Sequence, residues 1–334
     1  MLRPNLRAGL GGIDSSILRE SGQLRPDLAR GPIVRNLKYR MLQRLLRELK
    51  AEGSIQGSVH LCSGQEAIAV GACAALERRD ALTVTYRGHG WAIARGVPLA
   101  DLFAELMGRD SPLCGGRGGS AYFSSADHGL LGENSIVGAG VPIAAGAALA
   151  SRFKQDGAVS LVSIGDGAMN QGSVHEALNF AGVYGLALVV VLENNVYSEL
   201  TPIAAMIPTE TLVERAAVYG MPGVRIDGND AEEVEQAIRE AVARARVGEG
   251  PSLIEAMTER LIGHYDLDPQ HYRPRGEIER ALEHEPLARL RHRLPADQVA
   301  ALDAEAAGRI DEAVADARRI AFPDPATAFE HLYA

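Results

Sequence analysis

Two short apolar segments, residues 158–164 and 186–192, constrain the fold of this chain more than any other feature. Both consist only of Val, Leu, Ile, Ala and Ser, and each directly follows a glycine. Such runs are typical of strands that are buried on both faces of a parallel sheet. Residues 173–183 between them have the length of one crossover helix, which makes a right-handed strand–helix–strand unit. The sequence therefore predicts an α/β fold, a parallel sheet with helices on both faces.

Other segments continue this alternation of strands and helices. An amphipathic helix is expected where Leu37, Met41, Leu45 and Leu49 recur at helical spacing. The same patterns predict helices at 33–52, 65–76 and 231–246, and strands at 81–85, 224–226 and 253–256.

The remaining segments set the expected domain organisation. Residues 129–134 have a loop-like sequence, whereas a helical and charged pattern begins at residue 286 and continues to residue 316. We divide the chain into an N-terminal arm, one main domain and a helical C-terminal extension of the same domain, with bounds at 1–32, 33–285 and 286–334.

Composition excludes several classes of function. The formal net charge is −9, without the clustered basic residues that a nucleic-acid-binding face requires. The first 30 residues contain no apolar core of a signal peptide, and no later run is apolar enough to span a membrane. The cysteines are Cys62, Cys73 and Cys114, an odd number without metal-ligand spacing. We therefore expect a cytoplasmic protein that binds neither nucleic acid nor membrane.

Polar residues follow both apolar segments of the strand–helix–strand unit. The first is followed by Gly165-Asp166-Gly167, and the second by Glu193-Asn194-Asn195-Val196-Tyr197. The carboxyl ends of parallel strands meet at one edge of a sheet, where ligands bind. The glycines allow close approach of a diphosphate to the helix N-terminus that follows. The Asp166 carboxylate, the Asn195 side-chain carbonyl and the Tyr197 main-chain oxygen are ligands suited to Mg²⁺.

This pair of motifs, in which 26 residues separate Gly167 from Asn194, resembles the thiamin diphosphate motif. The chain around it resembles the α subunit of the first component of pyruvate, acetoin and branched-chain 2-oxo acid dehydrogenase complexes. Further similarity to that family lies, in the same order, in residues 59–67, 86–90, 115–120, 136–146 and 263–273.

The resemblance implies a thiamin diphosphate-binding fold with thiamin diphosphate and Mg²⁺ as cofactors. It implies oxidative decarboxylation of a pyruvate-like 2-oxo acid, or cleavage of acetoin, with acyl transfer to a lipoyl group on an acyltransferase. A β subunit would complete an α2β2 heterotetramer. In the family this β chain carries the glutamate that activates the cofactor, so the α chain alone is expected to be inactive.

The resemblance also implies roles for individual residues. His60, His89 and His264 would be catalytic, with His60 and His89 near the reacting carbon and His264 beside the diphosphate. The residues implied to bind the cofactor are Tyr86, Arg87, Ser135, Val137, Gly165, Asp166, Gly167, Ala168, Asn195, Tyr197 and His264.

Some positions depart from the commoner family pattern. Ser58 stands where an aromatic residue is usual, and Ser198-Glu199-Leu200 replaces a commoner Gly-Met-Gly. The apolar residue that bends the cofactor therefore cannot be placed. Ser58 motivates the hypothesis that the substrate pocket is altered, so that pyruvate is not the best substrate. Residues 263–269 are closer to acetoin-type members of the family.

Two other functions compete with this interpretation. Gly138-Ala139-Gly140 imitates the fingerprint of a NAD-dependent dehydrogenase, but that fingerprint should follow a buried strand, and residues 129–134 are expected to form a loop. The other alternative is a noncatalytic structural subunit that keeps the fold. Cofactor binding would distinguish the noncatalytic subunit from the enzyme.

Overall fold

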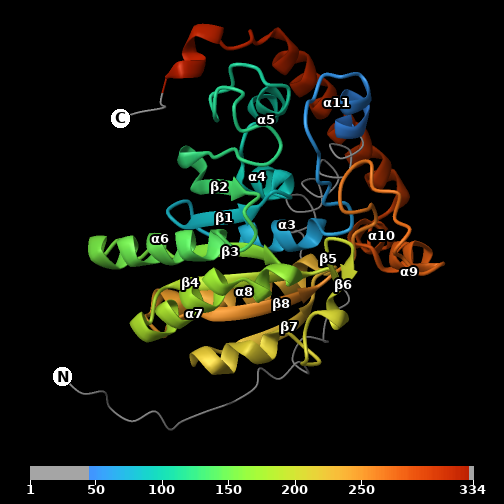
Figure 1. Cartoon of the computed structure of the whole chain (residues 1–334). Coiled ribbons are helices and arrows are strands. Elements are labelled where there is room, and N and C mark those ends of the chain that lie inside the picture. The colour runs from blue at the N-terminus through green and yellow to red at the C-terminus, as the bar shows by residue number, and fades with distance from the viewer. Residues whose placement is uncertain (1–44, 331–334) are drawn as a thin grey trace.

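A computed structural model describes residues 45–330 of the chain. Its centre is a parallel sheet of six strands in the order β2-β1-β3-β4-β8-β7 (Figure 1). The strands are β1 (Ala81–Thr85), β2 (Leu130–Asn134), β3 (Ser160–Gly165), β4 (Leu188–Asn194), β7 (Gly223–Asp227) and β8 (Ser252–Met257). A separate antiparallel hairpin is formed by β5 (Tyr197–Ser198) and β6 (Thr201–Pro202). The predicted α/β fold with a parallel sheet is confirmed.

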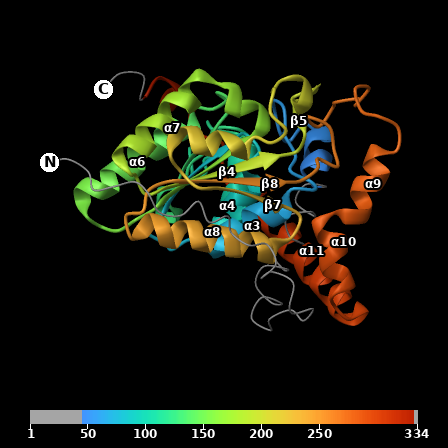
Figure 2. The same ribbon diagram turned by 90° about the horizontal axis from the view of Figure 1, so that it is seen from below.

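Helices cover both faces of this sheet (Figure 2). One face carries α6 (Gly140–Lys154) and α7 (Gly172–Tyr184), and the other carries α3 (Glu66–Ala74) and α8 (Ala231–Arg246). The remaining helices are α4 (His89–Arg95), α5 (Leu99–Leu106), α9 (Glu277–His284), α10 (Pro286–His292) and α11 (Ala296–Arg319). Short 3₁₀ helices are η2 (Ala126–His128), η3 (Asp166–Asn170), η4 (Ile203–Ala205), η5 (Val213–Tyr219) and η6 (Pro325–Phe329).

The continuous apolar runs of the central strands are explained by two separate cores. Successive residues of β4 face opposite sides of the sheet. Val189 and Val191 belong to the core beneath α3 and α8, whereas Val190 and Leu192 belong to the core beneath α6 and α7. A strand between two cores needs apolar residues at every position.

Strand β2 contradicts the expectation of a loop at residues 129–134. It pairs in parallel with β1 and lies at the edge of the sheet. Its sequence includes Gly132 and Glu133, and Leu131 is exposed, so it lacks the apolar pattern of a central strand. Edge strands are specified by pairing with a neighbour more than by their own composition. The prediction failed because that partner is distant in sequence.

Two further predictions concern the two ends of the described chain, the helix at 33–52 and the C-terminal extension from residue 286. The helix expected at 33–52 is seen from residue 45 to residue 51, and its earlier part and the arm at 1–32 lie outside the described residues. In the C-terminal extension, α11 packs along α5, and helix formation begins before residue 286, at α9. None of the helices within residues 45–330 combines the length and apolar character that a bilayer crossing needs.

Candidate functional site

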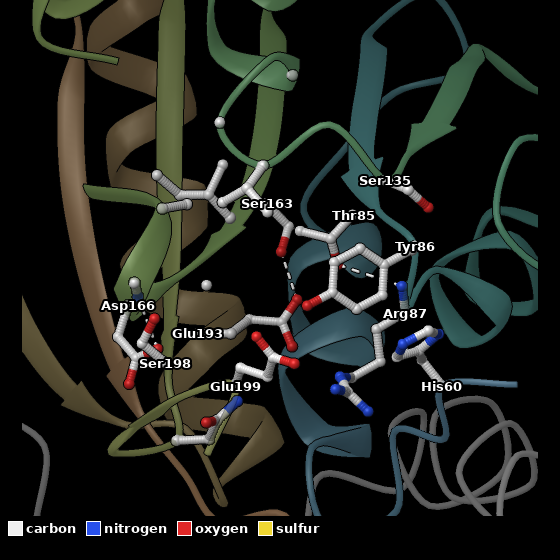
Figure 3. A pocket seen from close by; sticks show the side chains of 18 of the residues that line it. His60, Thr85, Tyr86, Arg87, Ser135, Ser163, Asp166, Glu193, Ser198 and Glu199 are labelled. Atoms are coloured by element: carbon white, nitrogen blue, oxygen red, sulfur yellow. Dashed lines mark hydrogen bonds between the residues drawn. The ribbon is translucent and has the colours of Figure 1, made fainter. Parts of the chain in front are cut away.

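A cavity of about 420 Å³ lies at the carboxyl ends of β1, β3 and β4 (Figure 3). The parallel register places Gly165 of β3 beside Glu193 of β4, so the two polar motifs share one edge of the sheet as expected. Twelve of the thirteen residues predicted for the site line this cavity: His60, Tyr86, Arg87, Ser135, Val137, Gly165, Asp166, Gly167, Ala168, Asn195, Tyr197 and His264.

The thirteenth residue, His89, does not line the cavity. Its ring is fully buried at the start of α4, where Nε2 lies 3.0 Å from the Ser120 hydroxyl and the ring stacks near Phe123. Burial lowers its pKa to about 4, which keeps the imidazole neutral. This position fits a residue that anchors the glycine-rich segment, residues 115–120, better than one that contacts a substrate. The catalytic role of His89 stays a prediction.

Asp166 has an unsatisfied oxygen inside the cavity region. Its Oδ1 accepts a hydrogen bond of 2.8 Å from the Gly167 amide, whereas Oδ2 is buried and has no hydrogen-bond partner. Burial raises the pKa of this carboxyl to about 6, which reflects the cost of an unpaired charge. A cation beside Oδ2 would remove that cost.

The turn after β4 brings Asn195 and Tyr197 to the same place. Val196 has a φ of 61°, a left-handed conformation that is rare for a β-branched residue. The Asn195 side-chain oxygen lies 3.4 Å from the Tyr197 amide, and its side-chain nitrogen donates to Gln65. The strained turn therefore holds Asn195 and Tyr197 in the wall of the cavity that Asp166 also lines.

The two glycines of the first motif have different surroundings. A Cβ at Gly167 would lie 2.6 Å from the Cβ of Ser198, so only glycine lets the hairpin pack there. A Cβ at Gly165 would meet no atom within 4 Å, so that position faces open space. Space next to an unpaired carboxylate oxygen and the start of η3 can accommodate an anionic group with its cation.

The donors at this place suit a hard divalent cation. Within residues 45–330, no three His, Cys, Asp or Glu side chains gather as a metal site. A metal held here would need one carboxylate from Asp166, neutral oxygens from residues such as Asn195, and oxygens from its own ligand. That is the usual arrangement for Mg²⁺ bound with a phosphate-containing molecule.

Two guanidinium groups also line the cavity. Arg87 donates to the main-chain oxygens of Leu61 and His264, the latter at 3.0 Å. Arg260 donates to the Glu199 main-chain oxygen at 2.8 Å, and burial lowers its pKa to about 10, which leaves it charged at neutral pH. The sequence analysis missed Arg260. Its position three residues after the end of β8 and four residues before His264 was a usable signal.

Three rings from distant segments form a cluster in the cavity wall. The ring centroids of His60 and Tyr86 are 4.5 Å apart, and those of His60 and His264 are 5.0 Å apart. Burial, followed by the nearby charge of Arg87, lowers the pKa of His60 to about 3 and that of His264 to about 4. Both imidazoles are therefore neutral at physiological pH.

Glu193 is a second lining residue that the sequence analysis did not single out. It is buried and accepts hydrogen bonds from Trp91 at 2.9 Å, from Gln65 and from Ser163. Burial raises the pKa of its carboxyl. A single acid at the end of an otherwise apolar strand was the signal that could have identified it.

Residues 263–273, one of the ranges that resemble the family, are folded against the cavity. Asp268 accepts hydrogen bonds from the His264 amide at 2.6 Å and from the Tyr272 hydroxyl at 2.8 Å. Because Arg87 also donates to the His264 carbonyl, the loop is tied to the cavity wall.

Among the departures from the family pattern, Ser58 is exposed and does not line the cavity. In contrast, Ser198 and Glu199 both line it. The altered substrate pocket inferred from Ser58 stays a prediction, and the departures that reach this cavity are those after Tyr197.

Comparison with known proteins supports one family across most of the chain. The family model described as dehydrogenase E1 component matches residues 35–326. The α subunit of acetoin:2,6-dichlorophenolindophenol oxidoreductase from Bacillus subtilis (strain 168) is 46% identical over 259 residues, covering 78% of each chain. The corresponding subunit from Cupriavidus necator is 38% identical over 288 residues, covering 84% of this chain and 86% of the relative. The pyruvate dehydrogenase E1 component subunit alpha of Zymomonas mobilis is 39% identical over 306 residues, covering 90% and 85%.

Proposed function

This chain belongs to the dehydrogenase E1 component family, and from that premise we propose that it is the α subunit of a thiamin diphosphate- and Mg²⁺-dependent enzyme. The reaction is oxidative decarboxylation of a pyruvate-like 2-oxo acid or cleavage of acetoin, with acyl transfer to a lipoyl group. One observation carries the proposal: Asp166, whose Oδ2 is buried and unpartnered, lines the same cavity as Gly165, where a Cβ would meet only open space.

The residues present fit the cofactor and its metal. Asp166, the Asn195 side chain and the Tyr197 main-chain oxygen would hold Mg²⁺, while the main chain of 165–168 would contact the diphosphate. Arg87 and Arg260 use some of their N–H groups on main-chain carbonyls, and their positive charge would help to balance the charge of the phosphates. Tyr86, Ser135 and Val137 line the rest of the cavity.

When bound, thiamin diphosphate would supply the nucleophilic carbon and the electron sink for breaking a carbon–carbon bond. The chain itself would hold and move protons. His60 Nδ1 is buried and has no hydrogen-bond partner, so a neutral imidazole is free to accept or donate at that atom. His264 is oriented through its own main chain by Arg87 and Asp268. The apolar and ring-lined walls would exclude water.

The proposed assembly includes a β subunit in an α2β2 heterotetramer and a lipoyl-bearing acyltransferase. The relatives are named as alpha subunits, which supports a second chain. A cytoplasmic location remains part of the proposal.

The two alternative functions, a NAD-dependent dehydrogenase and a noncatalytic subunit, are not equally compatible with the findings. Strand β2 does precede Gly138 and α6, so the expected loop no longer argues against a dinucleotide fingerprint. Membership of the E1 family across residues 35–326 argues against a NAD-dependent dehydrogenase instead. A noncatalytic subunit of the same family is the remaining alternative, because family membership alone does not require cofactor binding.

The test is calorimetric titration of thiamin diphosphate with Mg²⁺ into this chain co-expressed with a β partner. We expect binding that requires the metal and weakens about 100-fold in Asp166→Ala, which lacks a metal ligand. The control is Asp311→Ala, which removes an exposed acid on α11 and should leave the affinity unchanged. Absence of binding by a folded wild-type complex would overturn the proposal in favour of the noncatalytic subunit.

A further inference from the structure

A series of buried hydrogen bonds runs from the core into the cavity wall and ends at Asn195. Trp91 Nε1 donates to Glu193 at 2.9 Å, and Gln65 Nε2 donates to the same carboxylate at 2.5 Å. Asn195 Nδ2 in turn donates to Gln65 Oε1 at 3.2 Å. We propose that Gln65 is a positioning residue, which orients the Asn195 side chain so that its oxygen stays available to a metal. This inference rests on the proposed function and adds a residue to the same site.

The direction of the series is fixed at its inner end. The ring of Trp91 has a donor and no acceptor, and it donates to Oε1 of Glu193. The same oxygen accepts from the Ser163 hydroxyl (Figure 3), and Oε2 accepts from Gln65. Every hydrogen bond that the structure gives to this carboxylate is therefore one that it accepts. An amide that meets an acceptor presents its nitrogen, so Gln65 turns its oxygen away from Glu193.

This direction is passed on to Asn195. The side-chain oxygen of Gln65 can only accept, so Asn195 presents its nitrogen to it. The oxygen of Asn195 lies at the other end of the same planar amide, 3.4 Å from the Tyr197 main-chain nitrogen. A hydrogen bond of that length is weak, and a carbonyl oxygen has two lone pairs. The oxygen thus keeps the capacity to bind a hard cation, whereas an amide nitrogen carries only donors.

Burial makes the reversed arrangement unfavourable. Gln65, Glu193 and Asn195 are 2%, 6% and 7% exposed, so water has little access to replace a lost partner. If the Asn195 amide turned over, its oxygen would face the oxygen of Gln65, and its N–H groups would face the Tyr197 N–H group. Unpaired buried polar groups of this kind destabilise the turned arrangement. Gln65 is itself held at the start of α3, where its main-chain N–H donates to Cys62 at 2.9 Å.

The experiment reverses the series with one isosteric change, Glu193→Gln, in the complex with the β partner. Trp91 would still require an oxygen, so the new amide would present its nitrogen to Gln65. Gln65 would then turn over and donate to the oxygen of Asn195, which would leave a nitrogen toward the metal. The readout is the calorimetric affinity for Mg²⁺. Thiamin diphosphate is present in the same excess throughout, so the charge of the diphosphate is constant.

We expect Glu193→Gln to weaken Mg²⁺ binding about 10–100-fold. An Asn195→Asp background separates orientation from charge, because a carboxylate offers an oxygen at both ends. In that background Glu193→Gln removes the same charge but should cost no affinity for Mg²⁺. The matched control is Ser163→Ala, which takes another hydrogen bond from Glu193 without changing the direction of the series. It should weaken Mg²⁺ binding far less than Glu193→Gln does.

A reciprocal variant covers the case in which Glu193→Gln does not fold. Gln65→Glu combined with Glu193→Gln keeps one buried carboxylate and one amide. The amide at position 193 would accept from Trp91 and donate to the carboxylate at position 65, which would again take the nitrogen of Asn195. Its affinity for Mg²⁺ should stay close to that of the wild type. A loss of about tenfold or more in this variant would contradict the inference.

The remaining outcomes separate this inference from the proposed function. The inference is wrong, and the proposed function stands, if Glu193→Gln leaves Mg²⁺ binding unchanged, weakens it equally in both backgrounds, or matches Ser163→Ala. If the folded wild-type complex does not bind thiamin diphosphate with Mg²⁺, both are wrong.

Discussion

At the scale of single residues, Glu133 is the least expected group in this chain. It is buried on β2, and neither Oε1 nor Oε2 has a hydrogen-bond partner. A Cβ at Gly88 would collide with it, so that glycine provides its space. Burial raises its pKa well above the ordinary value. The folded state therefore binds a proton that the unfolded chain releases near pH 4.3, and stability falls as the pH rises from there toward the raised pKa.

Glu133→Gln should abolish this dependence because the amide keeps the shape and does not ionise. At pH 8 we expect the free energy of unfolding to increase by about 1–3 kcal/mol, with the gain disappearing as the pH approaches about 4.5. Urea unfolding of both proteins between pH 4 and 9 measures this gain in the free energy of unfolding. The exposed Glu283→Gln should show no gain, and a Glu133→Gln gain that is equal at all pH values would contradict the explanation.

At the scale of elements, one side chain organises the glycine-rich segment that follows α5. Glu105 is fully buried in α5 and accepts hydrogen bonds from the amides of Cys114, Gly116, Gly118 and Gly119 at 2.7–3.2 Å. A loop with so many glycines has a large conformational entropy in the unfolded chain. The four charge-assisted hydrogen bonds offset that entropy and set the path of the loop.

Glu105→Gln should loosen this loop, since the amide has a weaker acceptor and turns an N–H group toward other donors. We expect a loss of about 3 kcal/mol in the free energy of unfolding. Trypsin should also cleave faster after Arg117, which lies within the loop. Glu312→Gln on the exposed side of α11 is the matched control. Unchanged cleavage at Arg117 would show that other contacts hold the loop.

At the scale of the whole molecule, the C-terminal extension belongs to the same core as the sheet. Ile310, Ala313 and Ala317 of α11 are buried in the cluster that also contains Leu161 and Val191 of the central strands. Trp91, the single tryptophan, is buried in this cluster and donates to Glu193 in the cavity wall. A continuous core predicts that the extension and the site unfold together.

Ile310→Ala tests whether the extension and the site unfold together, since it removes buried side-chain carbons from α11. We expect a loss of about 2–5 kcal/mol, seen as the same downward shift in the fluorescence transition of Trp91 and in the far-ultraviolet circular dichroism transition. Leu282→Ala, at a half-exposed position on α9, should change stability by less than about 1 kcal/mol. Two separate transitions would mean that α11 is an independent unit.

The sequence by itself determined the centre of this fold. Residues 158–164 and 186–192 contain only apolar residues and two buried serines, a pattern typical of a strand with a core on each face, so β3 and β4 could be predicted from local composition. The glycines and polar residues at their ends then had to share one edge of the sheet. Twelve of the thirteen residues predicted from this and from the family motifs line the cavity.

Tertiary structure decided what depends on contacts between distant segments. Strand β2 is a strand because β1 pairs with it, and His89 is outside the cavity because α4 turns its ring toward Ser120. Arg260 and Glu199 join the site because their loops meet there. Local pattern encodes whether a side chain is buried, whereas the path of the whole chain decides which buried side chains face the same cavity.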